Sequence, residues 1–269
     1  MTPLPLSLVG STLARGSLRV LSRRPPGGNA AWDRTNHRGA TVSLLAGPAV
    51  VLAASVTSAL GAPTRQLGAA ALAVGLAAGA VGRYDDTRGA EEATSKGFRG
   101  HLRAAATGRL SGGAVKVLGI GAVSVLAAGA VTRNPVQRLV AGGVIAGAAN
   151  LVNLLDLRPG RALKVYTLAA TPLLSGPYGG LLAGPVGAAS AMLPDDLGER
   201  VMLGDAGANG LGALLGLRLA AGASPRGRVA LLAGLAALTA ASEVVSFSKI
   251  IAATPGLREL DALGRRPAR

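Results

Sequence analysis

Residues 139–156 read LVAGGVIAGAANLVNLLD, an unbroken apolar segment that ends in three polar side chains. A helix rises about 1.5 Å per residue, so this segment nearly crosses the roughly 30 Å hydrocarbon core of a membrane. Comparable apolar stretches recur along the chain near 41–60, 67–82, 114–132, 163–178, 179–194, 206–222 and 229–251, with a weaker one at Leu4–Val20. The sequence therefore predicts an all-α, polytopic transmembrane helix bundle of about nine spans.

The composition is typical of helices that pack against one another in lipid. Of the 269 residues, 49% are hydrophobic but only 2% are aromatic, and 40 are glycine. A soluble core would contain more large aromatic side chains, whereas small residues let membrane helices approach closely. The absence of cysteine excludes disulfides and thiolate metal sites, so carboxylates are the expected metal ligands.

The charged residues predict an orientation. The net charge is +15, but the bases lie in short loops between apolar stretches, which argues against a nucleic-acid partner. Most Lys and Arg residues fall in inside loops if the N-terminus is outside and the C-terminus is cytoplasmic. All acidic residues except Glu243 fall in the same loops. We expect one membrane domain, 1–269, with a basic cytoplasmic tail, 252–269, in the inner (plasma) membrane and with its active site facing the cytoplasm.

Two acidic motifs stand at the ends of apolar spans on this inside face. Asp85 and Asp86 are adjacent, and like charges so close are costly unless they bind a cation or a basic partner. Mg²⁺ with a diphosphate would satisfy them; the alternative is a solvated pair neutralised by Arg83 and Arg88. Asp205 lies between glycines just before another span, where the backbone can approach a ligand closely. A glycine turn alone would not explain the acid.

A third polar motif ends the segment quoted above. Asn150, Asn153 and Asp156 are spaced three residues apart, so a helix places them on one face at its cytoplasmic end. Chance seldom aligns three such polar groups at a helix end. The alternative is a packing role, in which the amides bridge neighbouring helices.

Together these residues resemble the motifs of the polyprenyl-phosphate N-acetylhexosamine-1-phosphate transferases, the family that includes the phospho-N-acetylmuramoyl-pentapeptide transferase of cell-wall synthesis. Asp85-Asp86 looks like the paired aspartates of that family, and Asn150-Leu-Val-Asn153-Leu-Leu-Asp156 looks like its Asn-x-x-Asn-x-x-Asp motif. The strongest match is Leu203-Gly204-Asp205-Ala206-Gly207 followed by Leu211-Gly212, and 32–39 is more loosely similar to the first cytoplasmic loop of the family.

The resemblance implies a metal site, a substrate site and a reaction. It implies Mg²⁺, with Mn²⁺ as a substitute, at the catalytic residues Asp85, Asp86 and Asp205. Substrate binding would fall to Lys96, Arg103, Asn150, Asn153, Asp156 and Lys164. The implied reaction transfers a sugar-1-phosphate from a UDP-sugar to a polyprenyl phosphate and releases UMP, in cell-envelope glycan synthesis. The implied partners are the polyprenyl phosphate lipid, the nucleotide sugar and the membrane, and a homodimer is compatible with them.

The sequence departs from the family in three places. Pro159 stands where a second Asp is common, Arg103 stands where a Lys is common, and the family's histidine-rich loop is missing, since His37 and His101 are the only histidines. These departures motivate one alternative, a catalytically inactive relative that binds lipid phosphate or nucleotide sugar in an envelope assembly. A small transporter is the other alternative, although the two halves show no clear self-similarity.

Overall fold

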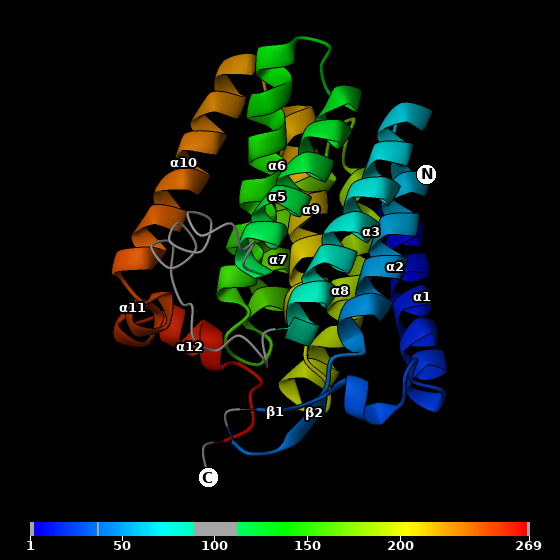
Figure 1. Ribbon diagram of the computed structural model, residues 1–269, viewed down its shortest axis with the longest axis vertical. Helices are drawn as coiled ribbons and strands as arrows, with labels where there is room; N and C mark the ends of the chain where they lie inside the picture. The colour runs from blue at the N-terminus through cyan, green and yellow to red at the C-terminus, as the bar shows by residue number, and fades with distance from the viewer. Residues whose placement is uncertain (1–2, 37, 89–111, 268–269) are drawn as a thin grey trace.

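The computed structural model describes residues 3–36, 38–88 and 112–267. The chain is mostly helical, as expected, and its long helices run side by side along one axis (Figure 1). The elements in order are α1 (Pro3–Arg23), η1 (Asn29–Ala31), β1 (Asp33–Thr35), β2 (Thr41–Ser43), α2 (Ala46–Gly61), α3 (Arg65–Arg88), α5 (Gly112–Ala127), η2 (Ala128–Ala130), α6 (Pro135–Leu155), α7 (Arg161–Ala170), η3 (Thr171–Leu174), α8 (Gly180–Leu197), α9 (Gly204–Gly222), α10 (Pro225–Val244), α11 (Phe247–Ala253) and α12 (Leu257–Ala262). A short antiparallel hairpin, β1–β2, is the exception to the all-α prediction.

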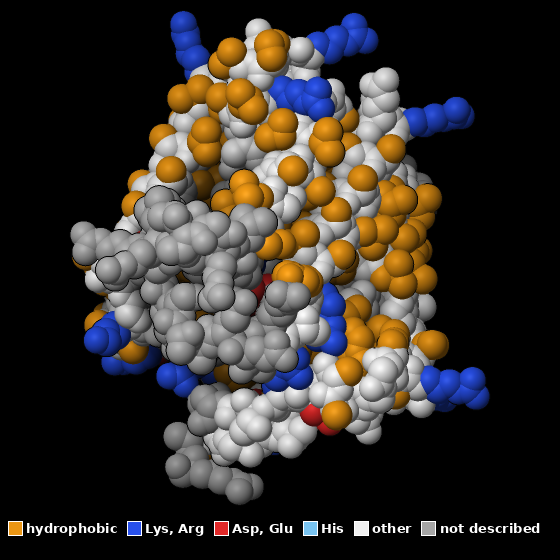
Figure 2. Space-filling model, in the orientation of Figure 1, with side chains coloured by type: hydrophobic (Ala, Val, Ile, Leu, Met, Phe, Trp, Pro, Cys, Tyr) orange, Lys and Arg blue, Asp and Glu red, His pale blue; other side chains and the backbone are white. Residues whose placement is uncertain are grey.

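Among the residues that the structure describes, three helices are long and apolar enough to cross a membrane, namely Arg65–Thr87 within α3, α6 and α10. Two more apolar helices, Ala46–Gly61 and Val115–Ala130, are shorter. Figure 2 shows hydrophobic side chains along the flank of the bundle and Lys and Arg side chains towards its two ends, the distribution of a protein that lies in lipid. Membrane character is thus supported, while the count of nine spans and the orientation stay predictions.

Helix α9 is the centre of the bundle and packs against α2, α3 and α6. Almost every residue from Gly204 to Leu217 is buried. Glycines make these contacts close: a Cβ at Gly212 would lie 2.6 Å from the Cα of Ala149 on α6, and one at Gly82 of α3 would overlap the carbonyl of Asp205. The small residues that permit membrane packing therefore bring the end of α3 directly against the start of α9.

Two predicted spans, 163–178 and 229–251, differ from the helices found there, since the second is divided into α10 and α11 after Val244. The segment expected at 163–178 is the ten-residue α7 followed by the 3₁₀ turn η3, because Pro172 lacks the amide that an α-helix would use there. The last span, α10, packs on α6 through Leu232 and Leu235, which face Gly143 and Gly147. Most of its remaining surface is exposed, including Glu243.

Candidate functional site

Four helix ends meet at the end of the bundle that also carries the hairpin and α12. Asp85 near the end of α3, Asp205 at the start of α9 and Lys116 at the start of α5 form one charged cluster. The Lys116 Nζ lies 3.1 Å from Asp85 Oδ2 and donates a short hydrogen bond to Asp205 Oδ2. The amide of Asn153, from the end of α6, completes the cluster. The neighbouring groups assign its orientation: with the nitrogen towards the carboxylate and the oxygen towards the ammonium, it lies 2.9 Å from Asp205 Oδ1 and 2.6 Å from Lys116 Nζ.

Asp86 points to a different partner from its neighbour Asp85. Its carboxylate accepts hydrogen bonds from the backbone amides of Asp205 (3.0 Å) and Ala206 (3.2 Å). These amides belong to the first turn of α9, where no earlier carbonyl can accept from them, and the positive end of the helix dipole favours an anion there. Gly204 begins this turn with φ of +64°, a conformation that favours glycine. Asp86 therefore fixes α9 so that the Asp205 side chain reaches the charged cluster.

The hairpin and the residues just before it also contact the end of α3. Arg34 of β1 donates to the backbone carbonyl of Asp86 at 2.8 Å. Arg83 donates to the carbonyl of Ala31 at 2.9 Å, and its guanidinium lies 3.8 Å from the ring centroid of Trp32. Such a cation–π contact stabilises the pairing of loop and helix. The loop that resembles the first cytoplasmic loop of the transferases thus contacts the helix end that bears the paired aspartates.

The three residues of the Asn-x-x-Asn-x-x-Asp motif lie in three different environments. Asn153 belongs to the charged cluster, whereas Asn150 donates to the Thr239 hydroxyl of α10 at 3.1 Å, the packing role considered above. Asp156 is the residue that ends α6. The motif therefore joins the acidic cluster to the turn that follows α6.

Lys164 lies apart from the cluster and contacts the C-terminal tail. Its ammonium donates to three backbone carbonyls at the end of α12, those of Leu260 (3.0 Å), Asp261 (2.7 Å) and Leu263 (2.8 Å). Cations are favoured at a helix C-terminus, where the carbonyls lack helical partners. Lys164 therefore anchors the tail, and we leave it out of the substrate site proposed below.

A second base of α7 holds the same tail. Arg161, whose side chain is 4% exposed, donates to both carboxylate oxygens of Asp261 at 2.8 and 2.9 Å. Burial in itself raises the pKa of Asp261, but the hydrogen bonds from Arg161 and Arg265 outweigh it, so this pKa lies below its ordinary value. The tail is thus a docked part of the fold.

Lys116 is the site residue that the sequence motifs did not identify. The signal was present, since a lysine within an apolar stretch is usually functional or paired. Its partners lie on α3, α6 and α9, far away in sequence, so no local pattern names them. The predicted substrate residues Lys96 and Arg103, and both histidines, lie outside the described residues.

The cluster has the donor chemistry that Mg²⁺ prefers. The ammonium of Lys116 is surrounded by the carboxylate oxygens of Asp85 and Asp205 and the amide oxygen of Asn153. Hard divalent cations bind the same kinds of oxygen ligand. Within the described ranges, no group of three or more His, Cys, Asp or Glu side chains could hold a metal ion. Two carboxylates and an amide are nevertheless sufficient for a cation that keeps several waters and binds substrate phosphates.

The sequence matches no protein-family model and no curated protein. The transferase resemblance therefore depends on the motifs alone.

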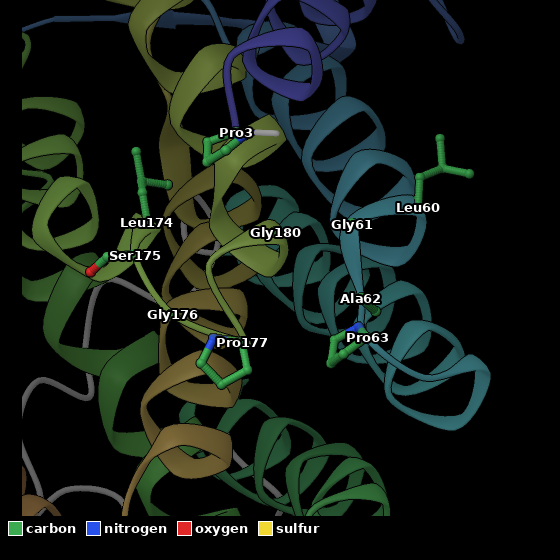
Figure 3. Close-up of a pocket in the computed structure, with 10 residues that line it drawn as sticks. All are labelled: Pro3, Leu60, Gly61, Ala62, Pro63, Leu174, Ser175, Gly176, Pro177 and Gly180. Atoms are coloured by element: carbon green, nitrogen blue, oxygen red, sulfur yellow. The ribbon is translucent and has the colours of Figure 1, made fainter. Parts of the chain in front are cut away.

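A pocket of about 490 Å³ lies at the opposite end of the bundle (Figure 3). It is lined by Pro3, Leu60, Gly61, Ala62, Pro63, Leu174, Ser175, Gly176, Pro177 and Gly180. This lining contains no ionisable side chain, so it offers no group for acid–base, metal or phosphate chemistry. The charged cluster is the better candidate for the functional site.

Proposed function

We propose that this chain is an integral-membrane, Mg²⁺-dependent transferase that moves a sugar-1-phosphate from a UDP-sugar to a polyprenyl phosphate. One observation carries the proposal: Asp85, Asn153 and Asp205, one from each of the three motifs, meet around a single positive charge. Separate apolar helices supply them, and nothing in their local sequence requires that they touch. The likeness to the transferase motifs supplies the substrate class.

In the proposed reaction, an oxygen of the prenyl phosphate attacks the sugar-linked phosphorus of the UDP-sugar. A new P–O bond forms to the lipid, the P–O bond to the uridine monophosphate breaks, and UMP leaves with its electron pair. A phosphoryl transfer of this kind depends mainly on positioning and charge neutralisation. Bound Mg²⁺ would neutralise charge on the diphosphate oxygens.

The chain's own residues have distinct roles in this proposal. The carboxylates of Asp85 and Asp205 and the amide of Asn153 would hold the metal and orient it towards the diphosphate. Asp86 keeps the first turn of α9 in place through its bonds to two backbone amides, and so positions Asp205. Arg34 and Arg83 tie the hairpin to α3 at the same end, where the proposed orientation puts the cytoplasm.

The experiment is an assay of the purified protein in detergent with undecaprenyl phosphate, Mg²⁺ and a panel of UDP-sugars, following UMP release. Release should require both lipid and metal and should be lost in Asp205→Asn. The matched control is Asp195→Asn, since Asp195 is a carboxylate at the same end that pairs with the exposed Arg15 and Arg200, away from the cluster. A well-folded protein that releases no UMP with any sugar would refute the transferase.

One observation favours a second candidate. A lysine already neutralises the carboxylates that would hold the metal, as in a protein that has lost catalysis. A catalytically inactive relative would still bind lipid phosphate or nucleotide sugar in an envelope assembly. Saturable binding of either ligand without UMP release would identify this function.

A further inference from the structure

Lys116 contacts the oxygen atoms that would hold the metal ion of the proposed function. Its ammonium contacts Asp85, Asp205 and the oxygen of Asn153, three oxygen atoms for three N–H donors. It is the only charged residue in the sequence of α5, so nothing else on that helix competes for the carboxylates. The side chain is mostly shielded, with 16% of its surface exposed.

The charge of the cluster explains why a cation is required there. Asp85 and Asp205 bring two negative charges together between apolar helices, and Lys116 supplies one positive charge. A divalent ion cannot simply join the lysine at these carboxylates, because an ion bound to the same oxygens would repel an ammonium at contact distance.

The chemistry of lysine allows it to leave. Its charge sits at the end of a flexible four-carbon chain and is not held in the planar fork of an arginine, so the ammonium can rotate away while α5 stays in place. By contrast, Arg34, Arg83 and Arg161 are bound to backbone carbonyls or to both oxygens of a carboxylate. The structural lysine, Lys164, is likewise bound to backbone carbonyls.

We propose that Lys116 is a displaceable internal cation, which neutralises Asp85 and Asp205 while no metal is bound and leaves their carboxylates when a divalent cation binds. The proposal rests on the proposed function in one respect, the use of a divalent metal at this site. It adds a residue that positions the metal ligands in the resting state and sets the metal affinity.

Removal of the lysine should have two opposite effects. Without metal, the carboxylates of Lys116→Met lose their counter-ion and repel each other, so the melting temperature should fall. Metal can bind only to the fraction of protein in which Lys116 has left the carboxylates, so the apparent metal affinity is scaled by that fraction. If the lysine occupies roughly nine-tenths of the sites, removing it should tighten metal binding by about tenfold. A merely structural lysine would lower the stability without tightening metal binding.

The test measures Mn²⁺ binding to the full-length protein in detergent by electron paramagnetic resonance of free Mn²⁺, together with thermal unfolding with and without Mg²⁺. The variants are Lys116→Met, Lys116→Gln and the charge-conserving Lys116→Arg. The control is Lys249→Met, which removes an exposed lysine of α11. We expect tighter Mn²⁺ binding and a larger Mg²⁺-induced rise in melting temperature for Met and Gln. Lys116→Arg should bind Mn²⁺ no more tightly than wild type, because a guanidinium leaves the carboxylates less readily, and the control should match wild type.

Two results would overturn the proposal. One is Mn²⁺ binding that is unchanged or weaker in both Lys116→Met and Lys116→Gln, since Gln can still donate hydrogen bonds and guards against a simple loss of folding. The other is the absence of Mn²⁺ binding in the wild type and in all variants. Failure of the transferase proposal is read separately, from UMP release, so a protein that releases UMP but shows no competition would refute only the role of Lys116.

Discussion

The buried ion pair between Arg161 and Asp261 should determine whether the C-terminal tail stays docked. Asp261→Asn keeps the shape of the side chain but removes its charge and one of the two acceptors for the guanidinium. Arg161 is 4% exposed and Asp261 12% exposed, so neither is well solvated in the docked state. Loss of the charge leaves the guanidinium without its counter-ion in a shielded position.

The size of the effect can be bounded from these contacts. Hydrogen bonds to charged groups contribute about 1.5–3 kcal/mol, and breaking a fully buried pair costs about 3–5 kcal/mol. Because the tail can open and expose Arg161 to water, we take about 2 kcal/mol for Asp261→Asn. At about 1.4 kcal/mol for each factor of ten, the undocked population should rise roughly 30-fold.

Hydrogen–deuterium exchange measures this opening directly, because amides exchange in proportion to the open population when reclosing is fast. Peptides from 247–266 should exchange faster in Asp261→Asn, while peptides from α9 should not change. Glu259→Gln is the matched control in the same helix, since the Arg258–Glu259 pair is 59% and 56% exposed and such surface pairs contribute little to stability. Equal protection in both variants would refute the reasoning.

Two further predictions follow from the close packing and from the pKa of Asp261. Gly82→Ala places a methyl group on the carbonyl of Asp205 and should lower the free energy of unfolding by about 1–3 kcal/mol. Gly121→Ala has open space around it and should leave the free energy of unfolding unchanged or raise it by up to about 1 kcal/mol. Thermal unfolding compares the two variants, and equal shifts in melting temperature would contradict the close packing at Gly82. The pKa of Asp261 is lowered on folding, so its contribution to docking is complete above the ordinary Asp pKa of about 3.9 and is lost as pH falls through the lower folded value. Tail exchange, corrected for the intrinsic rate, should therefore stay constant from about pH 5 to 8 and rise only below about pH 4; a rise near neutral pH would exclude Asp261 as the group responsible.

Much of the fold follows from local hydrophobic pattern. The apolar stretches at 41–60, 67–82, 139–156 and 206–222 correspond to α2, α3, α6 and α9, because a long apolar segment satisfies its backbone only as a helix. The hairpin was not predicted: its strands are only three residues long, too short for an alternating pattern to be visible. The break after α7 could be anticipated only from Pro172.

The candidate site was predicted in part. Three predicted residues do lie together, namely Asp85, Asn153 and Asp205. Each lies near one terminus of its helix, and these termini are on the same side of the bundle. Asn150 and Lys164 instead contact α10 and α12, and no motif distinguishes those partners from a ligand.

The sequence by itself determined which segments are helices and which end of each helix is polar, since both depend on neighbours a few residues away. Only the tertiary structure decided which polar groups touch. Gly82 has no side chain, so α3 can lie against the main chain of Asp205, and this contact sets the facing of two helices more than 100 residues apart. Packing also places Lys116 against the carboxylates of α3 and α9. The rotation of α5 about its own axis depends on how its surface packs against neighbouring helices, and that packing cannot be predicted from a local stretch of sequence.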